Sequence, residues 1–159
     1  MGSEDKTAPH TGGKMPGIIV GIDGSGHSQL ALDWAMREAK LRREPLSVLT
    51  VVHLSATGWH GMVVFPSSQE VVAEAREAAK EAAAKAAAQL GEAAPSTRVQ
   101  AVVGQPAEVL IDASQDADLL VLGSRGAGGF TRLTMGSVSS QVSQHAHCPV
   151  VILPGDRHA

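Results

Sequence analysis

Residues 116–140 read DADLLVLGSRGAGGFTRLTMGSVSS, and the rest of the chain is organised around this stretch. The apolar run at 119–122 has the length and composition of a buried strand. A loop follows with glycines at 123, 126, 128 and 129, and a polar, helix-compatible segment begins at Gly136 and Ser137. The stretch therefore predicts a strand, a glycine-rich loop and the start of a helix, in that order.

This order of elements suits the binding of an anion. Glycine lets the backbone approach a ligand closely and adopt positive φ. The unpaired N–H groups at a helix start carry partial positive charge, and the hydroxyls of Ser137, Ser139 and Ser140 add donors. The loop is neither a Walker loop, because no Gly-Lys-Ser/Thr follows, nor a strict GxGxxG, because Thr131 occupies the third position. The alternative is a long surface loop that merely uses glycine.

Four further strands and three further helices are expected around this stretch. Apolar or β-branched runs predict strands, and helical spacing or helix-start signals predict helices. A capping box at Ser67 and Glu70 opens the alanine-rich second helix. The expected strands are 17–22, 46–54, 98–103 and 148–153, and the expected helices run from Ser28 to before Pro45, from Ser67 to about Leu90 and from Pro106 to about Ser114.

Alternating strands and helices predict an α/β fold with one open five-stranded parallel sheet, helices on both faces and strand order 3-2-1-4-5. The first and fourth strands then flank the topological switch point, where ligands bind beyond the carboxyl ends. Asp23 follows the first strand and Gly123 ends the fourth. Asp23 could bind ribose hydroxyls or phosphate-bound Mg²⁺, or it could serve only in a turn or helix cap. Arg125 could neutralise phosphate or be an ordinary surface arginine.

Composition narrows the classes of partner and the compartment. The chain has 159 residues and a net charge of −3, which argues against a nucleic-acid polymer or an anionic membrane as the main partner. The single cysteine, Cys148, excludes an intramolecular disulfide framework and is expected in a cytoplasmic protein. No apolar run approaches transmembrane length, and the N-terminus lacks a signal-peptide core.

One domain is expected, over residues 17–155. Residues 1–16 are predicted to be a disordered leader and residues 156–159 a polar tail. Residues 55–68 form the least regular segment. A loop of this length is often a functional lid, although Trp59 and Phe65 could instead pack on the core.

No convincing catalytic or metal-binding constellation is present. His53 lies in an apolar run and is expected to be a core histidine. His145 and His147 form only an HxH pattern, which is too weak for a metal site, and Cys148 is expected to be a buried strand residue. There is no HExxH, GxSxG or CxxC sequence. The sequence therefore favours binding over catalysis.

The spacing Gly123-x-x-Gly126, nine residues, Gly136-Ser137-Val138-Ser139 resembles the G-2x-G-9x-G-S/T motif of the ATP-binding branch of the universal stress protein family. GIIVGIDGS at the start and CPVVIL at the end also resemble that family, and the similarity covers residues 17–154. The resemblance implies a Rossmann-like fold of the adenine nucleotide alpha hydrolase type. It also implies binding of ATP, or of AMP or ADP, with Mg²⁺ accompanying the nucleotide.

By position, the resemblance implies several ligand contacts. Asp23 would meet the ribose or a metal-linked phosphate, and Leu54 would offer backbone groups to adenine. Ala127 departs from the family pattern, because many relatives have a basic residue there. The remaining implied contacts, to phosphate and ribose, are Gly123, Gly126, Gly136, Ser137 and Ser139. Arg125, from its charge, and Val138, from its place within the motif, complete the candidate binding residues.

The resemblance further implies a homodimer built around the last strand, from Cys148 to Leu153, and a role in stress tolerance. Three functions stay open. The first is a nucleotide-dependent regulator with an unknown protein partner and little or no catalysis. The second is a slow ATP-hydrolysing or adenylate-handling enzyme, and the third is a dimerisation module that binds no nucleotide. The missing catalytic constellation favours the first.

Overall fold

The computed structural model of the chain describes residues 15–54, 57–59, 62–64, 67–125 and 135–155, with residues 57–59 and 62–64 described in their backbone alone. The main sheet contains β1 (Ile18–Ile22), β2 (Leu46–Val52), β5 (Thr97–Val103), β6 (Leu119–Gly123) and β7 (Val150–Leu153). The helices are α1 (Gly26–Arg42), α2 (Ser68–Ala88), the short 3₁₀ helix η1 (Gly91–Ala93), α3 (Pro106–Ala113) and α4 (Ser137–His145).

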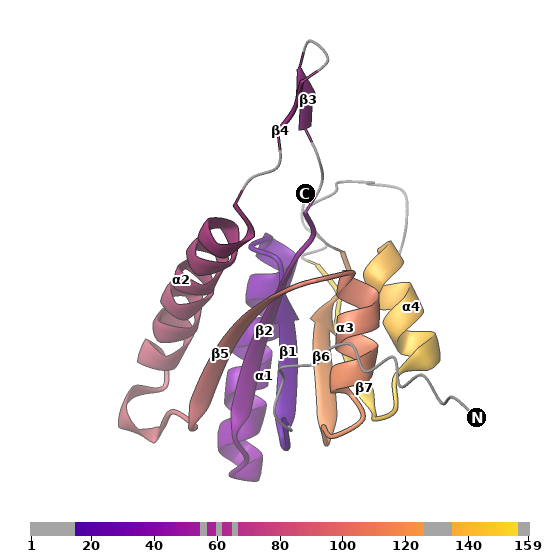
Figure 1. Cartoon of the computed structure of the whole chain (residues 1–159). Coiled ribbons are helices and arrows are strands. Elements are labelled where there is room, and N and C mark those ends of the chain that lie inside the picture. The colour runs from indigo at the N-terminus through magenta and orange to yellow at the C-terminus, as the bar shows by residue number, and fades with distance from the viewer. Residues whose placement is uncertain (1–14, 55–56, 60–61, 65–66, 126–134, 156–159) are drawn as a thin grey trace, which may run out of the picture.

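The main sheet is five-stranded and parallel, with the order β5-β2-β1-β6-β7 (Figure 1). Ile18 of β1 pairs with Leu46 of β2 on one side and with Leu119 of β6 on the other. The predicted order 3-2-1-4-5 is therefore confirmed. Because all strands are parallel, the carboxyl ends of β1 and β6 meet at one edge of the sheet, at the switch point.

Two apolar layers hold the helices against the sheet. On one face, α1 and α2 enclose a core cluster that includes Val20, Leu32 and Val48. On the other, α3 and α4 enclose a cluster that includes Ile19, Leu120 and Val142. Alternate residues of β1 thus enter opposite layers, as expected for a central strand that is buried on both faces. Helices on both faces are confirmed.

Residues 55–68 differ from the expected irregular loop. They contain β3 (Thr57–Trp59) and β4 (Met62–Val64), which pair antiparallel, with Thr57 opposite Val64. In Figure 1 this hairpin stands beyond the carboxyl edge of the main sheet. Each strand has only three residues, too few for alternation to stand out in a sequence. The Trp59 side chain and Phe65 lie outside the described residues, so neither the lid nor the core-packing expectation is tested.

Four local expectations need correction. Helix α1 begins at Gly26, because Ser25 is its N-cap and accepts a hydrogen bond from Ser28 N. Ser67 is the N-cap of α2, but its side chain makes no capping hydrogen bond, so the capping box is not formed. His53 is exposed, because β2 ends at Val52 and leaves it beyond the sheet. Cys148 is only partly buried and precedes β7.

The boundary of the domain also shifts. Met15, predicted to lie in the leader, is 7% exposed and belongs to the core cluster that contains Ile19. The domain therefore includes Met15. The predicted leader before Met15 and the tail at 156–159 lie outside the described residues.

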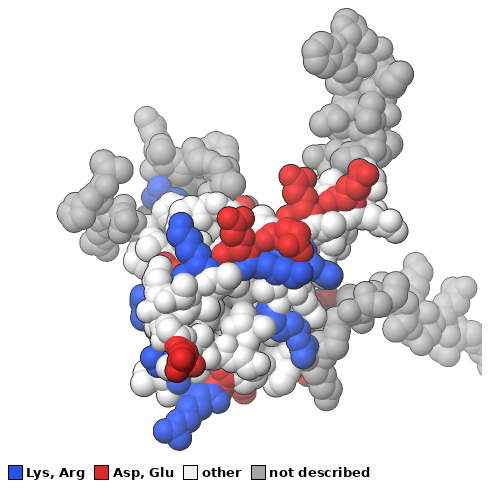
Figure 2. Space-filling model, turned by 90° about the vertical axis from the view of Figure 1, so that its left-hand side faces the viewer, with Lys and Arg blue, Asp and Glu red and all other residues white. Residues whose placement is uncertain are grey.

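The outward side of α2 is a mixed charged surface. Lys80 and Glu77 form an exposed ion pair with an N–O distance of 2.9 Å. Figure 2 shows acidic and basic side chains close together on this face of the molecule. Exposed ion pairs contribute little to stability, so this surface mainly keeps the outer face of α2 hydrated. No helix in the described ranges is long and apolar enough to cross a membrane.

Candidate functional site

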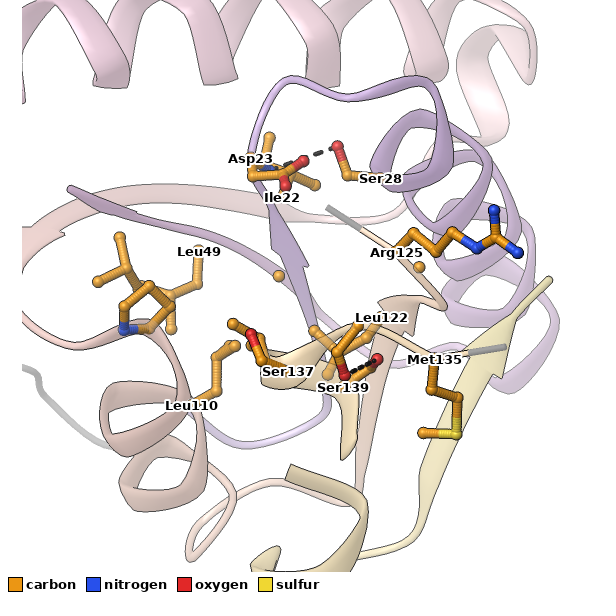
Figure 3. A pocket seen from close by; sticks show the side chains of 16 residues that line it. Ile22, Asp23, Ser28, Leu49, Leu110, Leu122, Arg125, Met135, Ser137 and Ser139 are labelled. Atoms are coloured by element: carbon orange, nitrogen blue, oxygen red, sulfur yellow. Dashed lines mark hydrogen bonds between the residues drawn. The ribbon is translucent and has the colours of Figure 1, made fainter. Parts of the chain in front are cut away.

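A cavity of about 500 Å³ opens at the carboxyl ends of β1, β2 and β6. It lies at the switch point between β1 and β6, where the strand order reverses. Figure 3 shows the side chains around it. The residues that line the cavity are Gly21, Ile22, Asp23, Ser28, Leu49, Val51, Pro106, Leu110, Leu122, Gly123, Arg125, Met135, Gly136, Ser137, Val138 and Ser139.

The turn from β1 into α1 forms one wall. Asp23 Oδ1 accepts a hydrogen bond from Ser25 N at 2.9 Å, and Gly24 adopts φ +82°, which favours glycine. The Ser28 hydroxyl donates to the Ser25 carbonyl at 2.9 Å and accepts from Asp23 N at 3.3 Å. Asp23 therefore has a turn-forming role, and its exposed side chain still lines the cavity.

The passage from β6 into α4 forms the facing wall. Gly136 N donates to the Ser124 carbonyl at 2.6 Å. The hydroxyl of Ser139, which is 3% exposed, donates to the same carbonyl at 2.9 Å and lies 3.1 Å from the Gly136 carbonyl. These bonds hold the two ends of the segment 125–135 together. Ser124 N in turn donates to Leu153 O at 2.8 Å, which attaches this base to β7.

The N-terminus of α4 faces the cavity without a side-chain cap. Gly136 is the N-cap residue and has no side chain that could accept from the first turn. Gly136, Ser137 and Val138 all line the cavity, and Ser137 is exposed. The first N–H groups of a helix have no intrahelical acceptor and carry partial positive charge. This wall can therefore bind an anion, and Arg125 adds a full positive charge nearby.

The other end of the cavity is apolar. It is lined by Leu49 and Val51 of β2 and by Pro106 and Leu110 of α3. In Figure 3, Leu49 and Leu110 lie on one side of the view and Arg125 and Met135 on the other, with Ser137 and Ser139 between them. The cavity thus offers an apolar surface at one end and anion-binding groups at the other.

Gly123 joins the two walls. A Cβ built at Gly123 would lie 2.7 Å from the carbonyl oxygen of His27, in the first turn of α1. Only a glycine lets the end of β6 approach the start of α1 this closely without a backbone shift. Gly123 therefore sets the distance between the walls.

The structure brings together seven of the nine residues expected at the site. Leu54 does not line the cavity, because the β2 contribution comes from Leu49 and Val51. Gly126 lies outside the described residues, as does Ala127. The seven cavity residues are Asp23, Gly123, Arg125, Gly136, Ser137, Val138 and Ser139.

The apolar end and Ser28 were missed from the sequence. Leu49 and Val51 alternate along β2, a pattern that indicates a shared face but not which face borders a cavity. Pro106 follows the carboxyl end of β5 and could have been found by the rule that ligands bind beyond such ends. Ser28 carried no signal beyond its place in a helix.

Residues 15–154 match the model of the Universal stress protein family. Universal stress protein Rv2623 of Mycobacterium tuberculosis is 33% identical over 151 residues, covering 90% of this chain and 49% of that protein. A universal stress protein of Mycolicibacterium smegmatis is 36% identical over 146 residues, with 90% and 49% covered. The chain thus spans about half the length of the curated relatives it matches.

Solved structures share the fold. Universal stress protein UspA from Lactobacillus plantarum has a TM-score of 0.64 and 27% identity, and the match covers 89% of this chain and 99% of that one. A universal stress protein in complex with cAMP has a TM-score of 0.63 and 24% identity, with 91% and 100% covered. An Arabidopsis thaliana family protein with AMP bound has a TM-score of 0.58 and 18% identity, with 90% and 93% covered. The latter two show the fold alone. From the family match over residues 15–154, the chain belongs to the universal stress protein family.

Proposed function

We propose that the cavity binds an adenine nucleotide, ATP together with Mg²⁺, and that the chain acts as a nucleotide-dependent regulator in the stress response. The observation that carries the proposal is the pairing of an apolar end with an uncapped helix start in one cavity at the switch point. A nucleotide has the matching division, because its base is largely apolar on its faces and its phosphates are anionic.

Each part of the nucleotide has a group to meet. The base would pack between Leu49 and Val51 on one side and Pro106 and Leu110 on the other. The phosphates would accept hydrogen bonds from the first N–H groups of α4 and from Ser137, with Arg125 balancing their charge. Asp23 would accept from ribose hydroxyls or approach phosphate-bound Mg²⁺. Leu54 and Gly126 remain proposed contacts.

Related proteins give independent support. The universal stress protein solved with cAMP and the A. thaliana protein solved with AMP each carry an adenine nucleotide. In those proteins the fold accommodates such a ligand. For this chain, the cavity remains the main support for the proposal.

A regulatory role is favoured over catalysis by the groups that the cavity lacks. Among the described lining residues, Asp23 is the single carboxylate and Arg125 the single cation. Rapid phosphoryl transfer needs a positioned water, a base or orienting group and strong charge stabilisation. The alternative is a slow ATP-hydrolysing or adenylate-handling enzyme. Measuring the rate of phosphate release from ATP distinguishes it from a regulator. Steady-state release above about one per second would place the protein in the ordinary enzyme range.

Calorimetry with ATP, GTP and adenosine tests the binding proposal. ATP should bind more tightly than GTP, because the extra polar groups of guanine would be desolvated against the apolar end without partners. Arg125→Gln should weaken ATP binding about tenfold, since a charged hydrogen bond typically contributes about 1.5–3 kcal/mol. It should leave adenosine binding unchanged.

Arg98→Gln is the matched control. Arg98 is exposed near the amino end of β5, away from the cavity. Its replacement by Gln removes the same charge as Arg125→Gln. Its ATP affinity should equal that of the wild type. No binding at millimolar ATP would reject the site, and equal loss of affinity in both variants would reject the role of Arg125.

A further inference from the structure

We propose that Ser139 and Ser28 are positioning residues, which fix the starts of α4 and α1 around the cavity instead of contacting the ligand. This inference rests on the proposed nucleotide function, because its readout is nucleotide affinity. It assigns a separate role to two serines that line the cavity and would otherwise pass for ligand contacts.

Ser139 closes the base of the segment 125–135. Its hydroxyl donates its one proton to the Ser124 carbonyl, at 2.9 Å, and lies 3.1 Å from the Gly136 carbonyl. Gly136 N donates to the same Ser124 carbonyl at 2.6 Å. The end of β6 and the start of α4 are therefore joined by two hydrogen bonds to one acceptor. This arrangement fixes the direction in which the uncapped α4 N-terminus points.

Ser28 makes the corresponding contacts at the other wall. Like Ser139, Ser28 is the third residue of its helix. Its hydroxyl donates to the Ser25 carbonyl at 2.9 Å. It also accepts from Asp23 N at 3.3 Å. Both serines are buried, Ser28 with 5% and Ser139 with 3% exposure. Each serine therefore joins the end of a strand to the start of a helix in one wall of the cavity.

The chemistry of the hydroxyl excludes a second donation. A serine hydroxyl has one proton, and phosphate oxygens only accept hydrogen bonds at neutral pH. In both serines the proton is already donated to a buried or half-buried backbone carbonyl. A phosphate could take that proton only by breaking the bond that holds the helix start. The two serines thus pre-organise the site, which lowers the ordering cost of binding.

The two serines predict different ligand profiles. Ser139→Ala should weaken ATP binding about three- to tenfold and leave adenosine binding unchanged, because α4 faces the phosphates alone. Ser28→Ala should weaken ATP and adenosine alike, because Asp23 is placed to meet the ribose that both ligands carry. Ser139→Thr keeps the hydroxyl and should recover most of the ATP affinity.

Ser143→Ala is the matched control for Ser139. The Ser143 hydroxyl donates within α4, to the Ser140 carbonyl at 2.8 Å, but it is exposed, and among the described residues it has no hydrogen bond to the end of β6. Its ATP affinity should be that of the wild type. Equal weakening of ATP and adenosine by Ser139→Ala, or no weakening at all, would overturn the assignment for Ser139. Unchanged affinities in Ser28→Ala would overturn it for Ser28.

Amide hydrogen exchange in the wild-type chain gives a second test that needs no variant. The Gly136 amide should be protected without nucleotide, because its acceptor is Ser124 O. The Ser137 and Val138 amides should exchange rapidly until ATP is added. If the Gly136 amide exchanged as rapidly as the Ser137 amide in the ligand-free protein, the proposed attachment of the α4 start to Ser124 would be wrong. Absence of ATP binding by the wild type would instead reject the proposed function, so the two failures are distinguishable.

Discussion

Gly123 is the first glycine of the motif, and the structure gives it a packing role beside its place in the cavity. The end of β6 lies directly against the first turn of α1, where the nearest atoms to a built Cβ are the carbonyl oxygen and carbon of His27, at 2.7 and 2.8 Å. Both atoms belong to the backbone and cannot swing aside. The glycine is therefore required by the fold before any ligand is considered.

Gly123→Ala should destabilise the protein by roughly 1–3 kcal/mol, because the added methyl forces the backbone of α1 to move. Urea unfolding should show a lower midpoint with an unchanged slope. Gly26→Ala is the matched control, since a Cβ at Gly26 meets nothing within 4 Å. A Gly123→Ala protein as stable as wild type would show that the walls are not held at this distance.

Cys148 should react slowly with iodoacetamide in the folded protein. Burial raises the pKa of its thiol, and the carboxylate of Asp118 adds to the rise, while a backbone hydrogen bond from Leu120 opposes it. The reactive thiolate is therefore scarcer than in the unfolded chain at the same pH. The ratio of unfolded to folded alkylation rates should be above one near neutral pH and fall as the pH rises. Equal rates in buffer and in urea at pH 7 would contradict this.

At the residue scale, the polar half of the site could be predicted from sequence and the apolar half could not. Asp23 and Gly123 stand out because each ends a recognisable strand, and Gly136 with Ser137 marks a helix start. Leu49 and Leu110 look like ordinary core residues. Only their positions next to an empty volume distinguish them, and that volume depends on how α3 crosses the sheet.

At the scale of elements, long periodic or β-branched segments were found and short ones were missed. The five main strands lie where their apolar runs predicted them, within a few residues at each end. The hairpin of β3 and β4 was not predicted, because its strands are shorter than the window in which alternation becomes visible. The start of α1 differs from the prediction because the N-cap residue Ser25, and not the apolar pattern, determines where the helix begins.

The edge strand β7 leads to a prediction about assembly. We propose that two copies of the chain pair through β7, which ends the sheet and is apolar along its length. Ile152→Lys should shift the protein toward monomer in sedimentation velocity at micromolar concentrations. Val151 is a poorer choice for this test, because it packs against the core cluster under α1 and its loss would also affect folding.

Val103→Lys is the matched control for assembly. Val103 is 47% exposed and ends β5, the strand at the opposite edge of the sheet. This variant should sediment like the wild type. A wild-type chain that is monomeric throughout, or a Val103→Lys chain that dissociates as readily as Ile152→Lys, would contradict pairing through β7.

At the scale of the whole molecule, the reversal of strand order places the functional groups together. β1 and β6 are far apart in sequence yet adjacent in the sheet, with Val20 opposite Val121. Their carboxyl ends bring Asp23 within the same cavity as Arg125 and α4. This placement was predictable, because it depends only on the strand order. The identity of the nucleotide is a proposal, and so is any protein partner. The chain spans only about half the length of the curated relatives it matches.

An amide NMR titration of the chain with Mg²⁺ and ATP tests the central proposal most directly. Because the phosphates are expected at the start of α4 and the ribose at the end of β1, the largest shift changes should fall on Gly136, Ser137, Val138 and Asp23. Residues at the amino end of the sheet, such as Thr97, should change little. No shift change at millimolar ATP, or changes centred away from the β1–β6 switch point, would contradict nucleotide binding in this cavity.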